Sequence, residues 1–391
     1  MMKIVLVITG LEIGGAEMML LKILENLSQE FSPEVVSLTT FGKVGHSIQA
    51  LGIPVTALDM KLGISTLITL VKLVRLLRAK RPHIVHTWMY HADLVGGLAA
   101  RLAKVPIVIW NIRHSNFASQ KTKLTTKLVI QICTKLSYFI PDCIQCCSIN
   151  ARDIHIELGY DADKFIVIPN GFDLQRFYPN PQARKRIRQE LNLSSSNMLV
   201  GMIGRFHPQK NHLAFFRAMS HVYCKLPKIH LLLAGKNINS GNLCLMAYIH
   251  ETGVKAIVHL LDERDDTPDL MASLDLLVLS SSEGEAFPNV VGEAMACAVP
   301  CVVTDVGDSA YIVANTGKIV DANDEMQLMQ AILSVLNLSE SERMTLGRMA
   351  RQRIETLFDI RQITQQYQDL YLQQCSKLNL DDQEWPLSSE N

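Results

Sequence analysis

The chain has 391 residues, of which 48% are hydrophobic and 19% are charged, and its 38 basic and 38 acidic residues give a formal net charge of zero. This composition is typical of a soluble globular protein and excludes a low-complexity or highly charged disordered chain. The length exceeds what a single hydrophobic core supports, so two domains are expected.

No apolar run approaches the roughly 18 residues of a membrane span, and the apolar stretch 4–8 is too short for the core of a signal peptide. We therefore expect a cytoplasmic protein. The nine cysteines follow no disulfide spacing, which favours reduced thiols. Cys143, Cys146 and Cys147 resemble half of a zinc site, but no second pair follows them, so we expect core thiols and no metal.

In the first part of the chain, short apolar runs rich in β-branched residues alternate with helical patterns. Helices are predicted from Ala16, over 67–81, from His91 and over 121–139. This alternation predicts βαβ units with buried parallel strands. The runs predicted as strands are 3–8, 34–38, 53–58, 83–88, 105–111, 143–148 and 165–169.

The alternation restarts after a polar, basic stretch at 173–196, and further strands are predicted at 198–204, 228–235, 256–261, 274–280 and 299–304. We therefore expect two doubly wound α/β domains, one over 1–175 and one over 176–357. Helical patterns continue from Glu340 to about Cys375, and the polar, acidic tail 379–391 is expected to be flexible.

Positive charge is concentrated in the first domain. Between residues 61 and 140, eight Lys and five Arg stand against Asp93 alone, a net charge of +12. The 67–81 helix places Lys72, Arg75 and Arg78 among Leu and Val, which is typical of a basic helix at a lipid surface. A solvated helix face is the alternative. Nucleic acid is disfavoured because no aromatic residues interleave the basic ones. We expect an anionic membrane surface as a partner and no nucleic acid.

Residues that follow strands are the candidate ligand contacts, because ligands of open α/β sheets bind beyond the carboxyl ends of strands. After the first strand, Gly14 and Gly15 open a helix, where backbone amides can approach an anion, although the spacing is not GxGxxG. After 198–204, the stretch GRFHPQKN brings Arg205 and Lys210 into one loop, where both cations can bind a diphosphate. Turn glycines and solvated loop cations are the alternatives.

The stretch SSEGEAFPNVVGEAMA at 281–296 places Glu285 and Glu293 eight positions apart around Pro288. Proline suits the first position of a helix, where no amide hydrogen is needed. The next amides are then expected to be free for an anion. They belong to Asn289, Val290 and Val291. Carboxylates around such amides suit a sugar nucleotide, because its hydroxyls can donate to the carboxylates and its phosphates can accept from the amides.

Four motifs now occur in a recognisable order: GGAE at 14–17, PNGFD at 169–173, GRFHPQKN at 204–211, and the pair Glu285 and Glu293 followed by AMACAVP. Together they resemble the retaining glycosyltransferases of family four (glycosyl transferases group 1), of the bacterial surface-polysaccharide type. The resemblance covers nearly the whole chain. It implies the GT-B fold, in which two Rossmann-like domains face each other across a cleft, with a helix near 358–376 packing back on the first domain.

The same resemblance implies residue roles. Glu285 would contact the donor sugar and Glu293 the ribose hydroxyls, Arg205 and Lys210 would bind the diphosphate, and Gly14 and Gly15 would approach the donor phosphate from the other domain. His114 stands at the position of a cleft histidine that contacts the donor sugar. The residues expected to bind the donor are Gly14, Gly15, Arg205, Lys210, Glu285, Ala286, Phe287, Pro288, Asn289, Val290 and Glu293; those expected to act in catalysis are Glu285, His114, Arg205 and Lys210.

Some positions remain open or depart from the family pattern. His86, at a strand end, is a candidate on the acceptor side. Ala286 and Ala298 stand where glycine is usual, and Asp308 and Tyr311 alter the run after Asp305.

The activity implied is the transfer of a hexosyl residue from a nucleotide-diphosphate sugar to an acceptor hydroxyl, with retention at the anomeric carbon. No Asp-x-Asp stands at a strand end, so the cations are expected to replace a metal, and no cofactor is expected. The expected acceptor is a lipid-linked saccharide of lipopolysaccharide or capsule synthesis, used at the inner face of the cell membrane. The alternatives are a nucleotide-sugar epimerase with the GT-B fold and a catalytically silent module that binds a sugar nucleotide.

Overall fold

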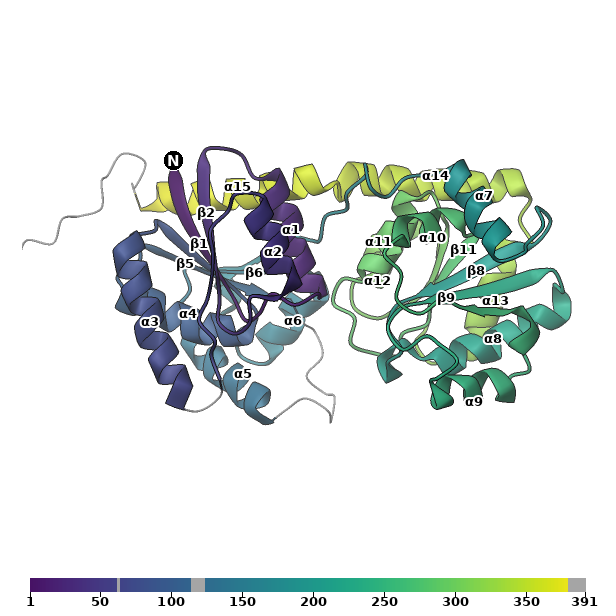
Figure 1. The fold of residues 1–391 in the computed structure, drawn as a ribbon, viewed down its shortest axis with the longest axis horizontal. Helices are drawn as coiled ribbons and strands as arrows, with labels where there is room; N and C mark the ends of the chain where they lie inside the picture. Colours follow the sequence, from purple (N-terminus) through teal and green to yellow (C-terminus); the bar gives the residue numbers. More distant parts are fainter. Residues whose placement is uncertain (62–63, 114–123, 379–391) are drawn as a thin grey trace, which may run out of the picture. The chain divides into compact units, whose positions relative to one another are not determined.

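The structure is a computed structural model that describes residues 1–61, 64–113 and 124–378. The chain forms two compact units (Figure 1). Unit 1 comprises Met1–Gly171 and Ile360–Asn391, and unit 2 comprises Phe172–Asp359. The chain thus leaves unit 1 after Gly171 and returns to it at Ile360. The sequence analysis had placed the first boundary at residue 175.

In its described residues, unit 1 is built on a seven-stranded parallel sheet of order β3-β2-β1-β4-β5-β6-β7. The order reverses between β1 and β4, so the loops that follow these two strands diverge at that point. The strands are β1 (Met2–Ile8), β2 (Phe31–Ser37), β3 (Val55–Ala57), β4 (Ile84–Trp88), β5 (Ile107–Ile112), β6 (Cys143–Cys146) and β7 (Phe165–Val167).

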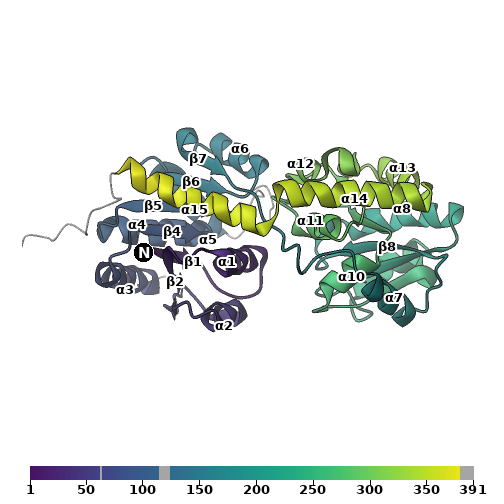
Figure 2. The same ribbon diagram turned by 90° about the horizontal axis from the view of Figure 1, so that it is seen from above.

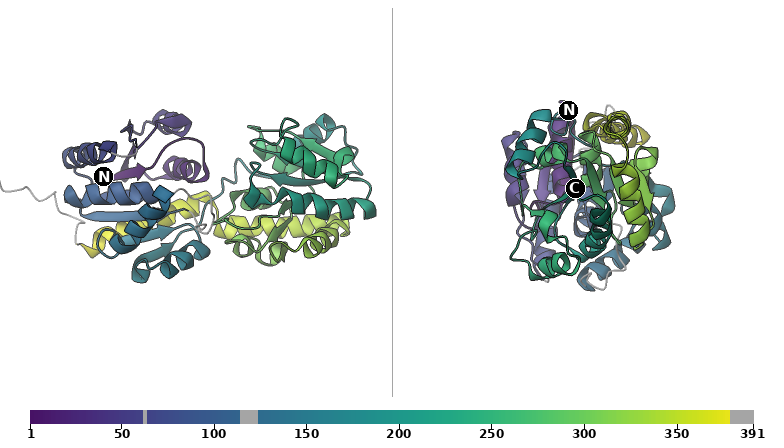
Figure 3. Two further views of the ribbon diagram at one scale, coloured as in Figure 1. Left: turned by 90° about the horizontal axis from the view of Figure 1, so that it is seen from below. Right: turned by 90° about the vertical axis from the view of Figure 1, so that its right-hand side faces the viewer.

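Helices cover both faces of this sheet, which is why every residue of β4 and β5 is buried. Figures 1 and 3 show α3, α4 and α5 on the face opposite to α15. The helices of unit 1 are α1 (Gly15–Asn26), α2 (Gly42–Ala50), α3 (Ile64–Lys80), α4 (Tyr90–Leu102), α5 (Leu124–Leu136), α6 (Ile149–Glu157) and α15 (Ile360–Lys377).

The helix α15 comes from the far end of the chain and completes the core of unit 1. It crosses the sheet near β4, β5 and β6 (Figure 2), and its residues share one hydrophobic cluster with α1 and α2. Tyr367 and Tyr371 are at most 1% exposed. Unit 1 is therefore discontinuous in sequence, and its core needs residues on both sides of unit 2.

Unit 2 is built, in its described residues, on a six-stranded parallel sheet of order β10-β9-β8-β11-β12-β13, which reverses between β8 and β11. The strands are β8 (Met198–Ile203), β9 (Ile229–Ala234), β10 (Val258–Leu260), β11 (Leu276–Leu279), β12 (Cys301–Thr304) and β13 (Lys318–Val320). The helices are α7 (Pro181–Glu190), α8 (His212–Lys225), α9 (Leu243–Glu251), α10 (Thr267–Ser273), α11 (Asn289–Ala296), α12 (Ser309–Val313), α13 (Glu325–Leu336) and α14 (Glu340–Leu357).

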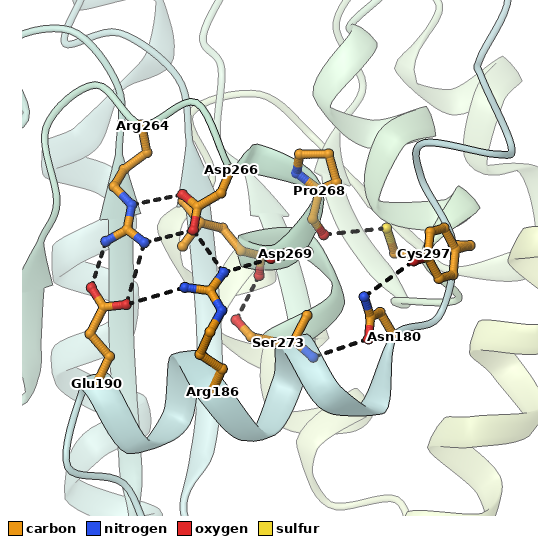
Figure 4. Close-up of polar contacts among 12 residues, drawn as sticks. Asn180, Arg186, Glu190, Arg264, Asp266, Pro268, Asp269, Ser273 and Cys297 are labelled. Atoms are coloured by element: carbon orange, nitrogen blue, oxygen red, sulfur yellow. Dashed lines mark hydrogen bonds and ion pairs between the residues drawn. The ribbon is translucent and has the colours of Figure 1, made fainter.

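The sequence analysis did not predict the strand β13 or the helices α7, α12 and α13 of unit 2, nor the helices α2 and α6 of unit 1. The strand β13 is only three residues long, too short to show a pattern. The helix α7 lies in the polar stretch 173–196, and it packs on α10 largely through charged side chains (Figure 4). Arg186 donates to Asp269 at 2.5 Å and to Asp266 at 3.0 Å. Its buried apolar residues are Ala183 and Ile187 and the others are mostly polar or charged, so the apolar stripe by which a helix is usually recognised is short.

Candidate active site

The candidate site of unit 2 lies where its strand order reverses. The loop after β8 contains Arg205 and ends in the 3-10 turn Pro208–Lys210, and the loop after β11 contains Glu285. The main chains of the two loops are joined, since the amide of Ser282 donates to the carbonyl of Gln209 at 2.8 Å. Residues 75 positions apart in the sequence are thereby brought to one point at the carboxyl edge of the sheet.

Lys210 and Glu285 form an ion pair at this point. The Lys210 Nζ donates to Glu285 Oε1 at 2.6 Å, and the two side chains are 19% and 13% exposed. The hydroxyl of Ser281, a fully buried residue, donates to the same oxygen at 2.6 Å. The carboxylate is therefore held by two donors. An ammonium carries three N–H groups, so Lys210 can keep Glu285 and still bind another anion.

Buried hydroxyls and a glycine hold these two loops in position. Ser280 donates to the carbonyl of Lys210 at 3.0 Å, and Thr304, at the end of β12, donates to the carbonyl of Ser281 at 2.6 Å. Gly307 has a φ of +60°, and a Cβ at this position would lie 2.0 Å from the carbonyl oxygen of Glu285. Only glycine permits this close approach. The loops after β8, β11 and β12 thus hold the Glu285 carboxylate in position.

The helix α11 begins at Asn289, with Pro288 as its N-cap. The expectation that the amide of Val291 is free was wrong, because it donates to the carbonyl of Pro288 at 3.1 Å. Glu293 lies in the second turn, half-buried. Ala286 is half-buried, while Phe287 is 6% exposed and packs against Phe172 and Phe358. Phe287 thus anchors the loop in the interior of unit 2.

Arg205 stands apart from this ion pair. It is exposed, and within the described ranges it forms no ion pair with an acidic side chain. Arg205 lies in the same loop as Lys210, so the loop after β8 carries two positive charges, of which only that of Lys210 is paired with Glu285. The arrangement of unit 2 can therefore receive a doubly charged anion without losing its internal ion pair.

In unit 1, the reversal of strand order places the start of α1 at the carboxyl edge of the sheet. Gly14 is the N-cap of α1 and Gly15 its first residue. The Glu17 carboxylate folds back over this start, since a Cβ on Gly14 would meet Glu17 Oε2 at 2.4 Å. Burial raises the pKa of Glu17, and its own backbone amide and the charge of Arg113 partly oppose that rise. This oxygen is the end of a flexible side chain, so a larger residue at position 14 would require the Glu17 carboxylate to move.

Arg113 directly follows β5 and is 9% exposed. Its guanidinium carbon lies 4.4 Å from the centre of the Trp88 ring. One terminal nitrogen donates to Asn170 Oδ1 at 2.7 Å, and the other lies 3.5 Å from the Tyr367 hydroxyl. The sequence analysis did not single out Arg113 or Asn170, although Asn170 belongs to the quoted motif PNGFD and Arg113 precedes His114. Their positions at strand ends were the available signal.

The two histidine candidates have different outcomes. His86 is fully buried within β4, and its Nδ1 lies 2.9 Å from the Tyr371 hydroxyl. Burial lowers the pKa of His86 to about 3, with a further contribution from the charge of Arg113. This environment is that of a neutral core histidine and does not favour an acceptor contact. His114 lies outside the described residues, so its role stays a prediction.

Two further observations concern the described ranges as a whole. In residues 1–61, 64–113 and 124–378, no three His, Cys, Asp or Glu side chains are grouped closely enough to hold a metal ion. The expectation of metal-independent chemistry remains a prediction. Within the same ranges, no helix combines the length and the hydropathy needed to cross a membrane.

Comparison with known families gives a match for each half of the chain. The model described as Glycosyltransferase Family 4 matches residues 13–176, and the model described as Glycosyl transferases group 1 matches residues 183–353. The two matches adjoin near the division between the units and together contain every strand of both sheets except β1.

Similar proteins include the Escherichia coli UDP-Gal:alpha-D-GlcNAc-diphosphoundecaprenol alpha-1,3-galactosyltransferase, 28% identical over 83% of this chain and 84% of the other. The Staphylococcus aureus capsular polysaccharide biosynthesis glycosyltransferase CapM is 24% identical over 78% of this chain and 81% of its own. Both similarities extend over both units.

Among solved structures, Anabaena Alr3699/HepE in complex with UDP superposes with a TM-score of 0.84 at 22% identity, covering 95% of this chain and 100% of the other. WaaG, a glycosyltransferase involved in lipopolysaccharide biosynthesis, superposes with a TM-score of 0.68 at 15% identity, covering 94% and 99%. At these identities the likeness concerns the fold alone, and it confirms the predicted architecture of two α/β domains.

Proposed function

We propose that this chain, which belongs to glycosyltransferase family four and has its GT-B fold, moves a hexosyl residue from a nucleotide-diphosphate sugar to a hydroxyl of a lipid-linked saccharide, with retention at the anomeric carbon. The observation that carries this proposal is the meeting of Lys210 and Glu285 at the point where the strand order of unit 2 reverses. Lys210 can bind a phosphate and Glu285 can accept from sugar hydroxyls, and hydrogen bonds hold their two loops together.

The reaction breaks the bond between the anomeric carbon and the diphosphate oxygen, so negative charge develops on the leaving group. Lys210 and Arg205 are the side chains that would stabilise this charge, and preorganised donors of this kind act most strongly in the transition state. Glu285 would accept hydrogen bonds from the donor sugar, and Glu293 from the ribose. Because Ser281 and Lys210 already hold the Glu285 carboxylate, little reorganisation is needed when the donor binds.

Two lines of support bear on the substrates. The E. coli relative is named for UDP-galactose and a diphosphoundecaprenol acceptor, and HepE was solved with UDP and with UDP-glucose. A uridine nucleotide sugar is therefore the first donor to try. A panel of nucleotide sugars can be screened by thermal shift, because a ligand at 100 times its dissociation constant adds about 2.7 kcal/mol.

The central test is transfer by Arg205→Ala and Lys210→Ala variants. Each should lower turnover by about a hundredfold or more while the protein stays folded. Arg217→Ala is the matched control, because Arg217 is an exposed cation of the same unit that pairs with Glu251 and Glu325. Turnover at the wild-type rate in a folded Lys210→Ala variant would refute the assignment. The anomeric configuration of the product, measured by NMR, tests retention, and activity in a chelator tests metal independence.

The membrane partner belongs to the same proposal. The exposed face of α3 presents Lys72 and Arg75 beside Leu67, Ile68 and Val71, which are 50–66% exposed. A solvated helix face has no need of such large apolar side chains, whereas a helix at a lipid interface combines both kinds. Arg78 is also exposed, although it donates to the carbonyl of Leu102 at 3.0 Å.

Sedimentation with anionic and neutral liposomes tests this partner. Wild type should bind anionic vesicles at low salt, and a variant with Glu at Lys72, Arg75 and Arg78 should not, because each basic residue near an anionic surface contributes about 1 kcal/mol. The control carries the same change at three exposed lysines of unit 2, Lys225, Lys228 and Lys255. Wild type that ignores anionic vesicles would favour a soluble acceptor.

A further inference from the structure

The exposed side of α3 has two halves of different character. Its residues follow one another at steps of three and four positions, the spacing at which residues of a helix are neighbours: Ile68, Val71, Lys72, Arg75 and Arg78. The half towards the start of the helix is apolar, and the half towards its end is basic. We refer to these five residues as the α3 face.

The positive charge of the α3 face has no acidic partner in the described part of the chain. Lys80, beyond the face, pairs with Glu34 at 2.9 Å. Within the described ranges, Lys72, Arg75 and Arg78 form no ion pair with an acidic side chain. The sequence contains no Asp or Glu at 60–92. The face therefore offers three positive charges and a flanking apolar surface to a partner of opposite charge.

The residues 379–391, referred to below as the tail, have a complementary sequence, NLDDQEWPLSSEN. The structure does not describe them. They include four acidic residues and no Lys, Arg or His. Three of the acids come first, Asp381, Asp382 and Glu384, and the large apolar residues Trp385 and Leu387 follow them. The tail thus has an acidic part followed by an apolar part.

The tail begins at the edge of the unit 1 sheet where the basic end of the α3 face also lies. The helix α15 ends at Lys377, and the Sγ of Cys375 lies 3.7 Å from the Sδ of Met2, at the start of β1. The amide of Lys3 donates to the Nδ1 of His83 at 3.0 Å, and His83 lies between α3 and β4. Both helices therefore end at the amino edge of the sheet.

Order and length favour a contact in which the tail runs back along α3. In an extended chain, the first and third acids of the tail are about 10 Å apart. The basic residues of the α3 face span about 9 Å along the helix axis. Beyond these charges, apolar residues come next on both partners. The tail reaches about 40 Å when it is extended, whereas α3 is about 26 Å long.

We propose that the tail docks on the α3 face, with its first three acids on the basic half and Trp385 and Leu387 on the apolar half. This contact takes the place of the free tail that composition alone predicts. It covers the surface that the proposed function assigns to an anionic membrane, and this part of the inference rests on that function. The tail is then an internal competitor of anionic lipid, and the membrane binds α3 once the tail leaves it.

The docking is measured in the full chain without lipid, through Trp385. Its emission is obtained by subtracting the spectrum of a Trp385→Phe variant from that of its parent. In the wild type, Trp385 should be protected from quenching by acrylamide. The changes Lys72→Glu, Arg75→Glu and Arg78→Glu should raise its quenching to that of free N-acetyltryptophanamide, because like charges then face each other.

Charge reversal on both partners distinguishes docking from a general effect of charge. Adding Asp381→Lys, Asp382→Lys and Glu384→Lys to the α3 variant should restore the protection of Trp385. The matched control carries Glu at three exposed lysines of unit 2, Lys225, Lys228 and Lys255, and should leave Trp385 protected. If the α3 variant does not fold, the tail reversal alone carries the test, because it should release Trp385 by itself.

Competition with lipid is measured by sedimentation with anionic vesicles, using a variant that keeps every charge, Trp385→Ser with Leu387→Ser. Its affinity for the vesicles should exceed that of the wild type by roughly 3- to 30-fold, because a contact that occupies the face most of the time lowers the apparent affinity by the free fraction. A tail that only repels anionic lipid would give the same affinity in both chains, which would refute the competition.

Two results would overturn the docking itself. One is equal quenching of Trp385 in the wild type and in the α3 variant. The other is protection that disappears when the protein is diluted, because the tail would then bind a second copy of the chain. If Trp385 is protected but neither chain sediments with anionic vesicles, the membrane partner in the proposed function is wrong. If the chains sediment but Trp385 is not protected, the proposed function stands and this inference falls.

Discussion

The ion pair between Lys210 and Glu285 can be tested by a double-mutant cycle. The substitutions are Lys210→Met, which keeps the apolar stem, and Glu285→Gln, which keeps an acceptor for the Ser281 hydroxyl. Removing one partner of a fully buried ion pair costs about 3–5 kcal/mol, whereas an exposed pair contributes about 0–1 kcal/mol. The two side chains are 19% and 13% exposed, and they meet at 2.6 Å. We therefore expect each single variant to lose about 1–3 kcal/mol and the coupling energy to be about 1–2 kcal/mol.

The assay must separate the two units, because a chain of two domains does not unfold in one transition. The sequence of unit 2 contains no tryptophan; Trp88 and Trp110 lie in unit 1, and Trp385 lies in the stretch 379–391, outside the described residues. Tryptophan fluorescence therefore identifies the unfolding of unit 1, and calorimetry gives the remaining transition, which belongs to unit 2. Only the second transition should move in these variants.

Ser281→Ala serves as an internal control for the cycle. It removes a hydroxyl that donates to the same Glu285 oxygen but leaves both charges in place. It should destabilise unit 2 by about 1 kcal/mol, and the coupling between Lys210 and Glu285 should persist in its presence. If the two single variants are additive within about 0.5 kcal/mol, the ion pair does not form in solution and the account of a preorganised carboxylate is refuted.

Three further predictions concern stability. Burial raises the pKa of Asp93 to about 8, although hydrogen bonds from Thr87 and Asn111 oppose the rise. Between about pH 4 and 8 the native state therefore holds a proton that the unfolded chain has released. The stability of unit 1 should fall from pH 6.5 to 8. Asp93→Asn should flatten that fall in fluorescence-monitored melts, and an unchanged slope would contradict the prediction. Ala298 follows α11 with a φ of +57°, a conformation that favours glycine, so Ala298→Gly should raise the stability of unit 2 in calorimetry by about 0.5–1 kcal/mol; a loss of stability would show that the backbone is not strained. Ending the chain after Asp359 removes the buried Tyr367 and Tyr371. Trp88 and Trp110 should then show the fluorescence of exposed indoles, while the calorimetric transition of unit 2 remains. A native fluorescence spectrum would contradict the role given to α15.

The sequence predicted most of the strands because short runs rich in apolar and β-branched residues alternate with helical patterns. Every run predicted as a strand overlaps a strand of the structure. It also pointed to the loops of the site, because parallel strands place their carboxyl ends at one edge. Among the missed elements, α7 has few apolar residues and contacts α10 through ion pairs, and β13 has only three residues, which form no pattern. The helices α2, α6, α12 and α13 were also missed.

Side-chain environments were harder to predict than positions. His86 lies near the end of a strand, but whether it faces the core depends on the pleat and on the tyrosines of α15, 285 positions away in the sequence. The partnership of Lys210 with Glu285 depends on which strands are neighbours, and one sequence does not state that order.

The divided sequence of unit 1 sets the order in which the chain folds as it is made. Unit 2 is one uninterrupted segment, so it is complete before α15 is synthesised. The strands of unit 1 are made first, but the helix that covers α1 and the adjoining face of the sheet comes about 200 residues after β7. At roughly 5–20 residues per second, that face stays open for on the order of 10–40 s. The domain that leaves the ribosome first is thus the last to close, and during that interval its apolar face is open to chaperones or to another nascent chain.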